Sequence, residues 1–96
     1  MTSVRIIVHG HVQGVGFRWF ARATARANGV VGWVRNLSDG TVEAELSGDS
    51  ESVRTVIDAL RAGPESARVD RVDESTPDPR ATSDFAAPTK DFEIRG

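Results

Sequence analysis

The chain has 96 residues, no cysteine and a formal net charge of −2 at pH 7. That length suffices for one small two-layer domain, and the absence of cysteine excludes disulfides, thiolate nucleophiles and cysteine-based metal sites. The slightly acidic balance argues against a nucleic-acid-binding protein, which usually carries a basic face, but not against a small anionic substrate held in a local positive field.

The first third of the chain predicts a strand followed by a helix. Residues 4–8 are mostly β-forming, and Gly10 ends the run. Residues 18–28 are rich in alanine and arginine, contain no proline or glycine, and end in Asn28-Gly29, a typical helix C-terminus. The segment between them, HVQGVGF, carries two glycines. We therefore expect a sharp turn at this strand-to-helix junction.

The middle of the chain predicts a β-hairpin. Residues 30–37 and 41–46 have strand character, and Ser38-Asp39-Gly40 between them is a hairpin turn. In the second of these strands, Val42, Ala44 and Leu46 alternate with polar residues. One face of the hairpin is therefore expected to be buried and the other exposed to water.

A second helix is expected from Asp49 or Ser50, either of which can cap it, to about Ala62. Its apolar residues recur at intervals of three and four, which produces one buried stripe, and Gly63-Pro64 ends it. The remaining predicted segments are a strand at residues 67–73, a loop with three prolines at residues 75–90, and a short closing strand at residues 91–95.

The predicted order is β-α-β-β-α-β with a short final strand. This order is typical of an α+β, ferredoxin-like sandwich, in which an antiparallel sheet carries two helices on one face. We expect residues 1–96 to form a single domain. The fold alone does not specify a reaction, because it hosts many unrelated functions.

The segment from Gln13 to Arg18 has the properties of an anion cradle. Glycines allow the backbone to approach a ligand closely, and the free N–H groups at a helix start favour negative charge. Arg18 at the first helical turn can add a bidentate contact to phosphate oxygens. Taken alone, the segment is better explained by a tight turn followed by a solvated arginine.

Asn36 lies at the end of a predicted strand, directly before the hairpin turn. A side-chain amide can both donate and accept hydrogen bonds, so it can hold a water in one orientation. Asparagine also commonly shapes turns. Taken alone, Asn36 is better explained by the turn.

Together, HVQGVGFR and the later GWVRNLSDGTVE resemble the paired signature of the acylphosphatase family, and FEIR at residues 92–95 resembles its closing strand. The resemblance covers nearly the whole chain and is weakest at residues 75–90. It implies hydrolysis of acyl phosphates to a carboxylate and inorganic phosphate, with no metal or other cofactor. It implies that Arg18 grips the phosphoryl group and that Asn36 positions the attacking water. The implied phosphate-binding loop consists of the backbone amides of Gln13, Gly14, Val15, Gly16, Phe17 and Arg18.

Other residues receive plainer interpretations. His9 and His11 lack a third metal ligand nearby, so they are expected to be ordinary strand-end residues. Trp19 and Trp33 could stack on an aromatic acyl group, although core packing or partial exposure is favoured. If the closing strand ends beside the cradle, the carboxylate of Gly96 is expected to orient Arg18.

The sequence has no signal peptide and no run of about 18 apolar residues that would span a membrane. We therefore expect a cytoplasmic, monomeric enzyme that binds neither membranes nor nucleic acid. The main alternative is a non-catalytic, anion-binding regulatory module of the same fold. A domain cut from a larger maturation enzyme is a third interpretation, and the start at Met1 favours an independent protein.

Overall fold

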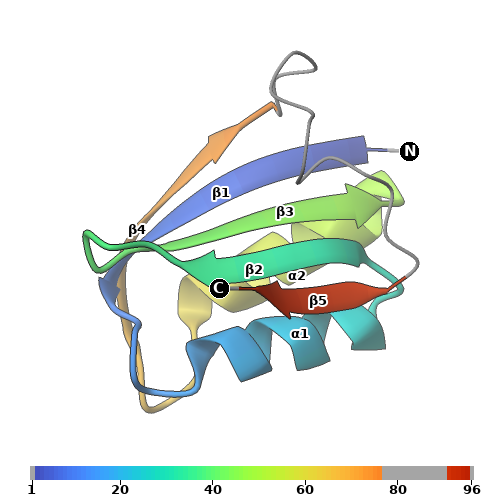
Figure 1. Cartoon of the computed structure of the whole chain (residues 1–96). Helices are drawn as coiled ribbons and strands as arrows, with labels where there is room; N and C mark the ends of the chain where they lie inside the picture. The colour runs from blue at the N-terminus through green and yellow to red at the C-terminus, as the bar shows by residue number, and fades with distance from the viewer. Residues whose placement is uncertain (1, 77–90, 96) are drawn as a thin grey trace.

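Five strands form one sheet, and two helices cover one face of it (Figure 1). The structure is a computed structural model that describes residues 2–76 and 91–95. The strand order across the sheet is β4-β1-β3-β2-β5. The α+β, ferredoxin-like fold expected from the sequence is confirmed. The elements are β1 (Thr2–His11), α1 (Phe17–Ala27), β2 (Val31–Asn36), β3 (Val42–Gly48), α2 (Ser50–Ala62), β4 (Arg68–Ser75) and β5 (Phe92–Arg95).

The sheet is mixed, whereas the sequence analysis expected a wholly antiparallel one. β5 pairs with β2 in parallel, from Gly32 opposite Phe92 to Arg35 opposite Arg95, while the other neighbouring strands are antiparallel. Parallel neighbours need a long crossover rather than a hairpin, and β3, α2 and β4 lie between β2 and β5 in the chain. As a result, β2 has a hydrogen-bonded strand on each side.

The core lies between the sheet and the two helices. Alternate residues of β1 and β3 face the helices, and α1 and α2 each contribute an apolar stripe, which the periodicity predicted for α2. Removing this surface from water is the main stabilising contribution to a domain of this size. The core includes Ile6, Val8, Phe17, Ala21, Ala25, Val34, Val42, Ala44, Leu46, Val53, Val56, Ile57, Leu60 and Phe92.

The two helices begin in different ways. The side chain of Asp49 caps α2 by accepting a hydrogen bond from the Glu51 N–H, at 3.2 Å. α1 begins after Gly16 and has no side-chain cap and no acidic residue in its first turn. The amides at the start of α1 are therefore open to another acceptor. Within the described residues, neither helix is long and apolar enough to cross a membrane.

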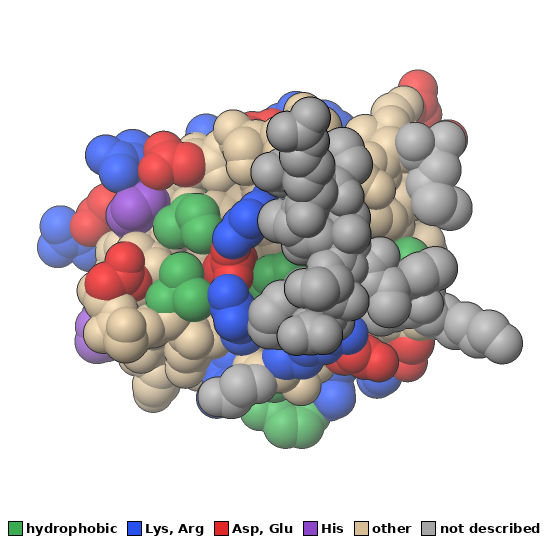
Figure 2. All heavy atoms as spheres, turned by 45° about the horizontal axis from the view of Figure 1, so that its top comes forward, with side chains coloured by type: hydrophobic (Ala, Val, Ile, Leu, Met, Phe, Trp, Pro, Cys, Tyr) green, Lys and Arg blue, Asp and Glu red, His purple; other side chains and the backbone are tan. Residues whose placement is uncertain are grey.

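The face of the sheet turned away from the helices is charged, and Figure 2 shows basic and acidic side chains side by side on it. Glu43 of β3 is buried there, with 1% of its side chain exposed. Arg5 of β1 contacts one of its carboxylate oxygens, and Arg35 of β2 donates to the other at 2.7 Å. Charged groups are rarely buried unless they are paired, and the two arginines provide that pairing.

Candidate active site

A pocket of about 310 Å³ opens where the β1–α1 loop, the first turn of α1 and the end of β2 meet. The two segments that the sequence analysis singled out therefore lie together in space. The pocket is lined by Val12, Gly14, Gly16, Phe17, Arg18, Trp19 and Asn36.

The backbone of the β1–α1 loop depends on two glycines. Gly14 has φ of 76° and Gly16 has φ of 78°, a region that other residues rarely adopt, whereas Val15 between them does not have a positive φ. No atom lies within 4 Å of a Cβ added at either glycine, so the requirement is conformational rather than steric. Successive N–H groups in such alternating conformations form a concave site for anions. The uncapped start of α1 adjoins this concave loop.

Side-chain hydrogen bonds hold the loop in place, some donated by a loop residue and one donated to the loop by a residue outside it. The amide of Gln13 donates from Nε2 to the carbonyl oxygens of Leu37, at 2.6 Å, and Thr41, at 2.9 Å. The Ser66 hydroxyl donates to the carbonyl of Val15, at 2.9 Å. Gln13 thus connects the loop to the β2–β3 hairpin that follows Asn36. The sequence motifs predict a role only for the backbone of Gln13, and no sequence signal identifies its side-chain partners.

Arg18 lines the pocket and makes no hydrogen bond, ion pair or ring contact with the described residues. Every other arginine in residues 2–76 and 91–95 has an ion pair or lies over a tryptophan ring. A cation in the first turn is also unfavourable, because the helix N-terminus carries a partial positive charge. The position of Arg18 therefore does not contribute to helix stability, but it suits the binding of an anion.

Asn36 is the last residue of β2, and its side chain lines the same pocket. Its amide oxygen Oδ1 is buried and has no hydrogen-bond partner among the described residues. Leaving such an acceptor unsatisfied costs about 1–3 kcal/mol, and a bound molecule that donates a hydrogen bond to it removes this cost. Asn36 and Arg18 therefore line one pocket, and within residues 2–76 and 91–95 they carry an acceptor and a cation without partners.

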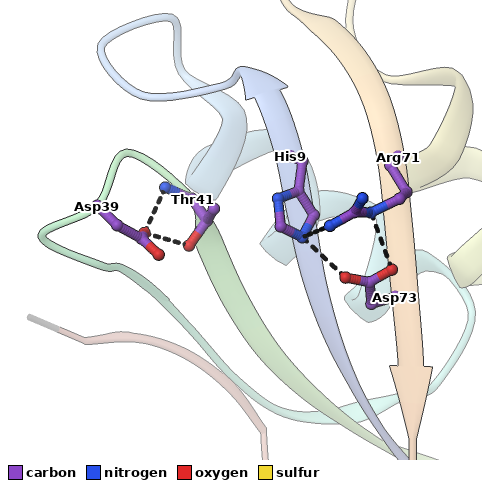
Figure 3. A network of polar contacts seen from close by, with 5 residues as sticks. All are labelled: His9, Asp39, Thr41, Arg71 and Asp73. Atoms are coloured by element: carbon purple, nitrogen blue, oxygen red, sulfur yellow. Dashed lines mark hydrogen bonds and ion pairs between the residues drawn. The ribbon is translucent and has the colours of Figure 1, made fainter.

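Asp39 is engaged in the hairpin turn and does not line the pocket. Its Oδ1 accepts hydrogen bonds from the Thr41 hydroxyl, at 2.6 Å, and the Thr41 N–H, at 3.0 Å (Figure 3). These hydrogen bonds, led by the one from the hydroxyl, hold the pKa of Asp39 below its usual value. A carboxylate with a lowered pKa is a weaker base, and this one shapes the turn.

His9 belongs to a surface cluster with Asp73 and Arg71 of β4 (Figure 3). His9 Nε2 lies 2.9 Å from Asp73 Oδ2 and 3.3 Å from an Arg71 nitrogen, and Arg71 Nε lies 3.0 Å from Asp73 Oδ1. Hydrogen bonding by His9, followed by the charge of Arg71, lowers the pKa of Asp73. Among the described residues, no three His, Asp or Glu side chains are grouped so that they could hold a metal ion.

The two tryptophans have different environments. Trp33 is 3% exposed and lies near the guanidinium groups of Arg35 and Arg95, on the sheet face opposite the helices. Trp19 is 62% exposed and forms part of the pocket wall. The expected contact between the Gly96 carboxylate and Arg18, and the predicted loop from residue 77 onward, lie outside the described residues.

Comparison with known proteins identifies the family. A family model described as acylphosphatase matches residues 4–94. The chain belongs to the acylphosphatase family. This assignment confirms the family and the hydrolase activity expected from the sequence motifs.

Individual acylphosphatases support the same assignment over most of the chain. One from Thermococcus kodakarensis is 50% identical over 78 residues, which cover 81% of this chain and 86% of that relative. One from Anaeromyxobacter dehalogenans is 48% identical over 91 residues, which cover 95% of this chain and 91% of that relative. The crystal structure of the Bacillus subtilis acylphosphatase is similar to this structure, with a TM-score of 0.87 and 31% sequence identity. The alignment covers 100% of each chain.

Proposed function

We propose that this acylphosphatase binds the phosphoryl group of an acyl phosphate between the Gln13–Arg18 loop and Arg18 itself, and that Asn36 positions the attacking water. One observation carries the proposal. Arg18 and Asn36 line the same pocket at the uncapped start of α1, and neither the Arg18 guanidinium nor the buried Asn36 Oδ1 has a partner among the described residues.

The loop and Arg18 stabilise the charge of the transition state. A phosphoryl group in transfer spreads negative charge over its equatorial oxygens, and catalysis consists mainly of positioning and charge stabilisation. The N–H groups of the Gly14–Gly16 turn and the first turn of α1 donate to these oxygens, while Arg18 adds a full charge and a planar pair of donors. These groups supply the positive charge that Mg²⁺ and lysine supply in nucleotide-binding enzymes.

Asn36 orients the nucleophile. Its Oδ1 accepts a hydrogen bond from the water, which directs a lone pair of that water toward phosphorus. A bond forms between the water oxygen and phosphorus as the bond from phosphorus to the carboxyl oxygen breaks. The carboxylate departs with the bonding electron pair, and the water proton passes to a phosphate oxygen, which gives inorganic phosphate.

No protein general base is assigned to this step. Asp39 is the acidic residue closest in sequence to Asn36, and its hydrogen bonds to Thr41 keep its pKa low. The leaving carboxylate is itself a weak base and needs little protonation. We expect Asp39→Asn to retain most activity, because an amide oxygen still accepts from Thr41. Loss of activity as complete as that of Arg18→Ala would refute this expectation.

We also propose that residues 1–96 act as a single-domain monomer in the cytoplasm, without a cofactor. The monomeric state is supported by the surface: among the described residues, Trp19 is the single large apolar side chain that is exposed. These residues therefore present no broad apolar patch through which two copies would associate.

The test is hydrolysis of benzoyl phosphate in excess chelator by wild type, Arg18→Ala and Asn36→Ala. Losing one preorganised donor to an oxyanion typically lowers kcat by about 10² to 10³, and Arg18 supplies a charge as well, so at least this loss is expected for Arg18→Ala. Arg18→Lys should also fail, because a point charge does not reproduce the planar pair of donors.

Arg54→Ala and Asn28→Ala are matched controls. Arg54 pairs with Glu74 and Asn28 donates to the carbonyl of Thr24, both outside the pocket. Rapid turnover by wild type and both controls, with collapse in both pocket variants, supports the assigned roles. A wild type that binds phosphate through Arg18 but hydrolyses nothing would instead favour the non-catalytic anion-binding module.

A further inference from the structure

The pocket wall has a polar part and an apolar part. The polar part is the loop backbone with Arg18 and Asn36, and the apolar side chains are Val12, Phe17 and Trp19. Val12 and Phe17 are each 1% exposed, so they offer almost no surface to a ligand. Trp19 is 62% exposed, so it is the one of these three apolar residues whose side chain is accessible to a ligand.

Arg22 restrains that indole. The guanidinium carbon of Arg22, one helical turn further along α1, lies 4.0 Å from the centroid of the Trp19 ring. Contact between a guanidinium and an aromatic face is attractive, so this contact limits the orientations that the ring adopts.

The chemistry of an acyl phosphate places its acyl group beside this ring. On the proposed function, the phosphoryl group binds to the Gln13–Arg18 loop, which continues into the first turn of α1. The acyl group is joined to it through a single bridging oxygen, so it must lie in the same pocket or at its mouth. Because Trp19 directly follows Arg18 in the chain, an acyl group joined to the bound phosphoryl group would lie close to the aromatic ring of Trp19.

We propose that Trp19 is a specificity-determining residue, whose indole contacts the acyl group and favours aromatic or long acyl chains over acetyl. This inference rests on the proposed function of Arg18 and the loop. Aromatic rings stack with an attraction beyond simple burial, whereas the single methyl group of acetyl phosphate has little surface to offer.

The test compares benzoyl phosphate with acetyl phosphate in wild type, Trp19→Ala and Trp19→Phe. Trp19→Ala should raise KM for benzoyl phosphate by about three- to tenfold, the range expected for one aromatic contact, with a much smaller effect on acetyl phosphate. Trp19→Phe should restore most of the preference, because it retains an aromatic face. Inhibition by inorganic phosphate should be the same in all three proteins, since phosphate has no acyl group.

Failure of this inference is distinguishable from failure of the proposed function. If the KM values for the two substrates change equally in Trp19→Ala, or if neither changes, Trp19 does not select the acyl group. If wild type hydrolyses neither substrate, the proposed function itself is wrong. Circular dichroism of Trp19→Ala should match wild type, because the side chain is mostly exposed and lies outside the core.

Discussion

Gln13 connects the phosphate-binding loop to the hairpin that follows Asn36, so removing its side chain tests whether that connection serves catalysis. Gln13→Ala deletes the two hydrogen bonds to the carbonyls of Leu37 and Thr41. Neither carbonyl is left alone, because Leu37 still accepts from Gly40 N–H and Thr41 from Leu37 N–H. The variant therefore loses only the net value of two hydrogen bonds, about 1–2 kcal/mol in free energy of unfolding.

The effect on catalysis should exceed the effect on stability. Asn36 ends β2 directly before the braced hairpin, and a misplacement of about 1 Å in a catalytic group can lower the rate about 10²-fold. We expect kcat for benzoyl phosphate to fall about 10- to 100-fold. The inhibition constant of inorganic phosphate should change little, since Arg18 and the glycines remain.

Steady-state kinetics and urea denaturation of the same preparations check both magnitudes. Asn28→Ala is the matched control, because it removes one amide-to-carbonyl hydrogen bond at the far end of α1. It should lower stability by about 1 kcal/mol with kcat unchanged. If Gln13→Ala loses stability but keeps wild-type kcat, the bridge is purely structural and the reasoning about Asn36 is refuted.

Three further predictions concern the backbone, the buried carboxylate and acid stability. Gly16→Ala should weaken inhibition by inorganic phosphate, because alanine at φ of 78° costs about 1–2 kcal/mol. Gly29→Ala is the control: Gly29 has φ of 67° but lies beyond the other end of α1, so inhibition by phosphate should be unchanged. Glu43→Gln should lower the free energy of unfolding, measured in urea, by about 2 kcal/mol. Its kcat should be unchanged, since Glu43 lies on the sheet face opposite the helices. Unchanged stability would contradict the argument that the two arginines pair with a buried carboxylate. Hydrogen bonding and charge from Arg54 lower the pKa of Glu74 from its ordinary 4.5, so its stabilisation is present above that pH and is lost as the pH falls through the lowered pKa. The difference in Tm between wild type and Glu74→Gln should therefore be largest near neutral pH and shrink below pH 4.5, and a difference independent of pH would contradict it.

The elements were predictable because their signals are local. Gly63-Pro64 ends α2 and Asp49 caps it, as expected from neighbouring residues. The alternation in β3 places Val42, Ala44 and Leu46 in the core as expected, but the expectation that its other face is exposed to water was wrong at Glu43, which is buried. β1 runs from Thr2 to His11, longer than the predicted strand at residues 4–8, because pairing with β3 and β4 extends it. The meeting of Arg18 and Asn36 was predictable only through the family motifs.

The remaining features depend on contacts between segments that are distant in sequence. The parallel pairing of β5 requires a long crossover, which leaves no local pattern. Glu43 alternates with apolar residues as an exposed residue would, yet arginines from two neighbouring strands enclose it. The side chain of Gln13 finds its acceptors beyond α1 and β2. The exposure of Trp19 likewise follows from where α1 packs, since Phe17 and Ala21 take the buried positions.

The place of β5 beside β2 has a consequence for the chain while it leaves the ribosome. β2 precedes β5 by two strands and a helix, so throughout that interval β2 presents an open edge of unpaired backbone groups, which can pair with a neighbouring nascent chain. Light scattering should show that a chain released before Asp91 aggregates more readily than the full chain, and equal solubility would argue against this. When the four residues of β5 arrive, Arg26 of α1 pairs with Asp91, and Gly32 of β2 donates to the Asp91 carbonyl. The short strand that we expect to cover this open edge also completes the support of the strand that carries Asn36.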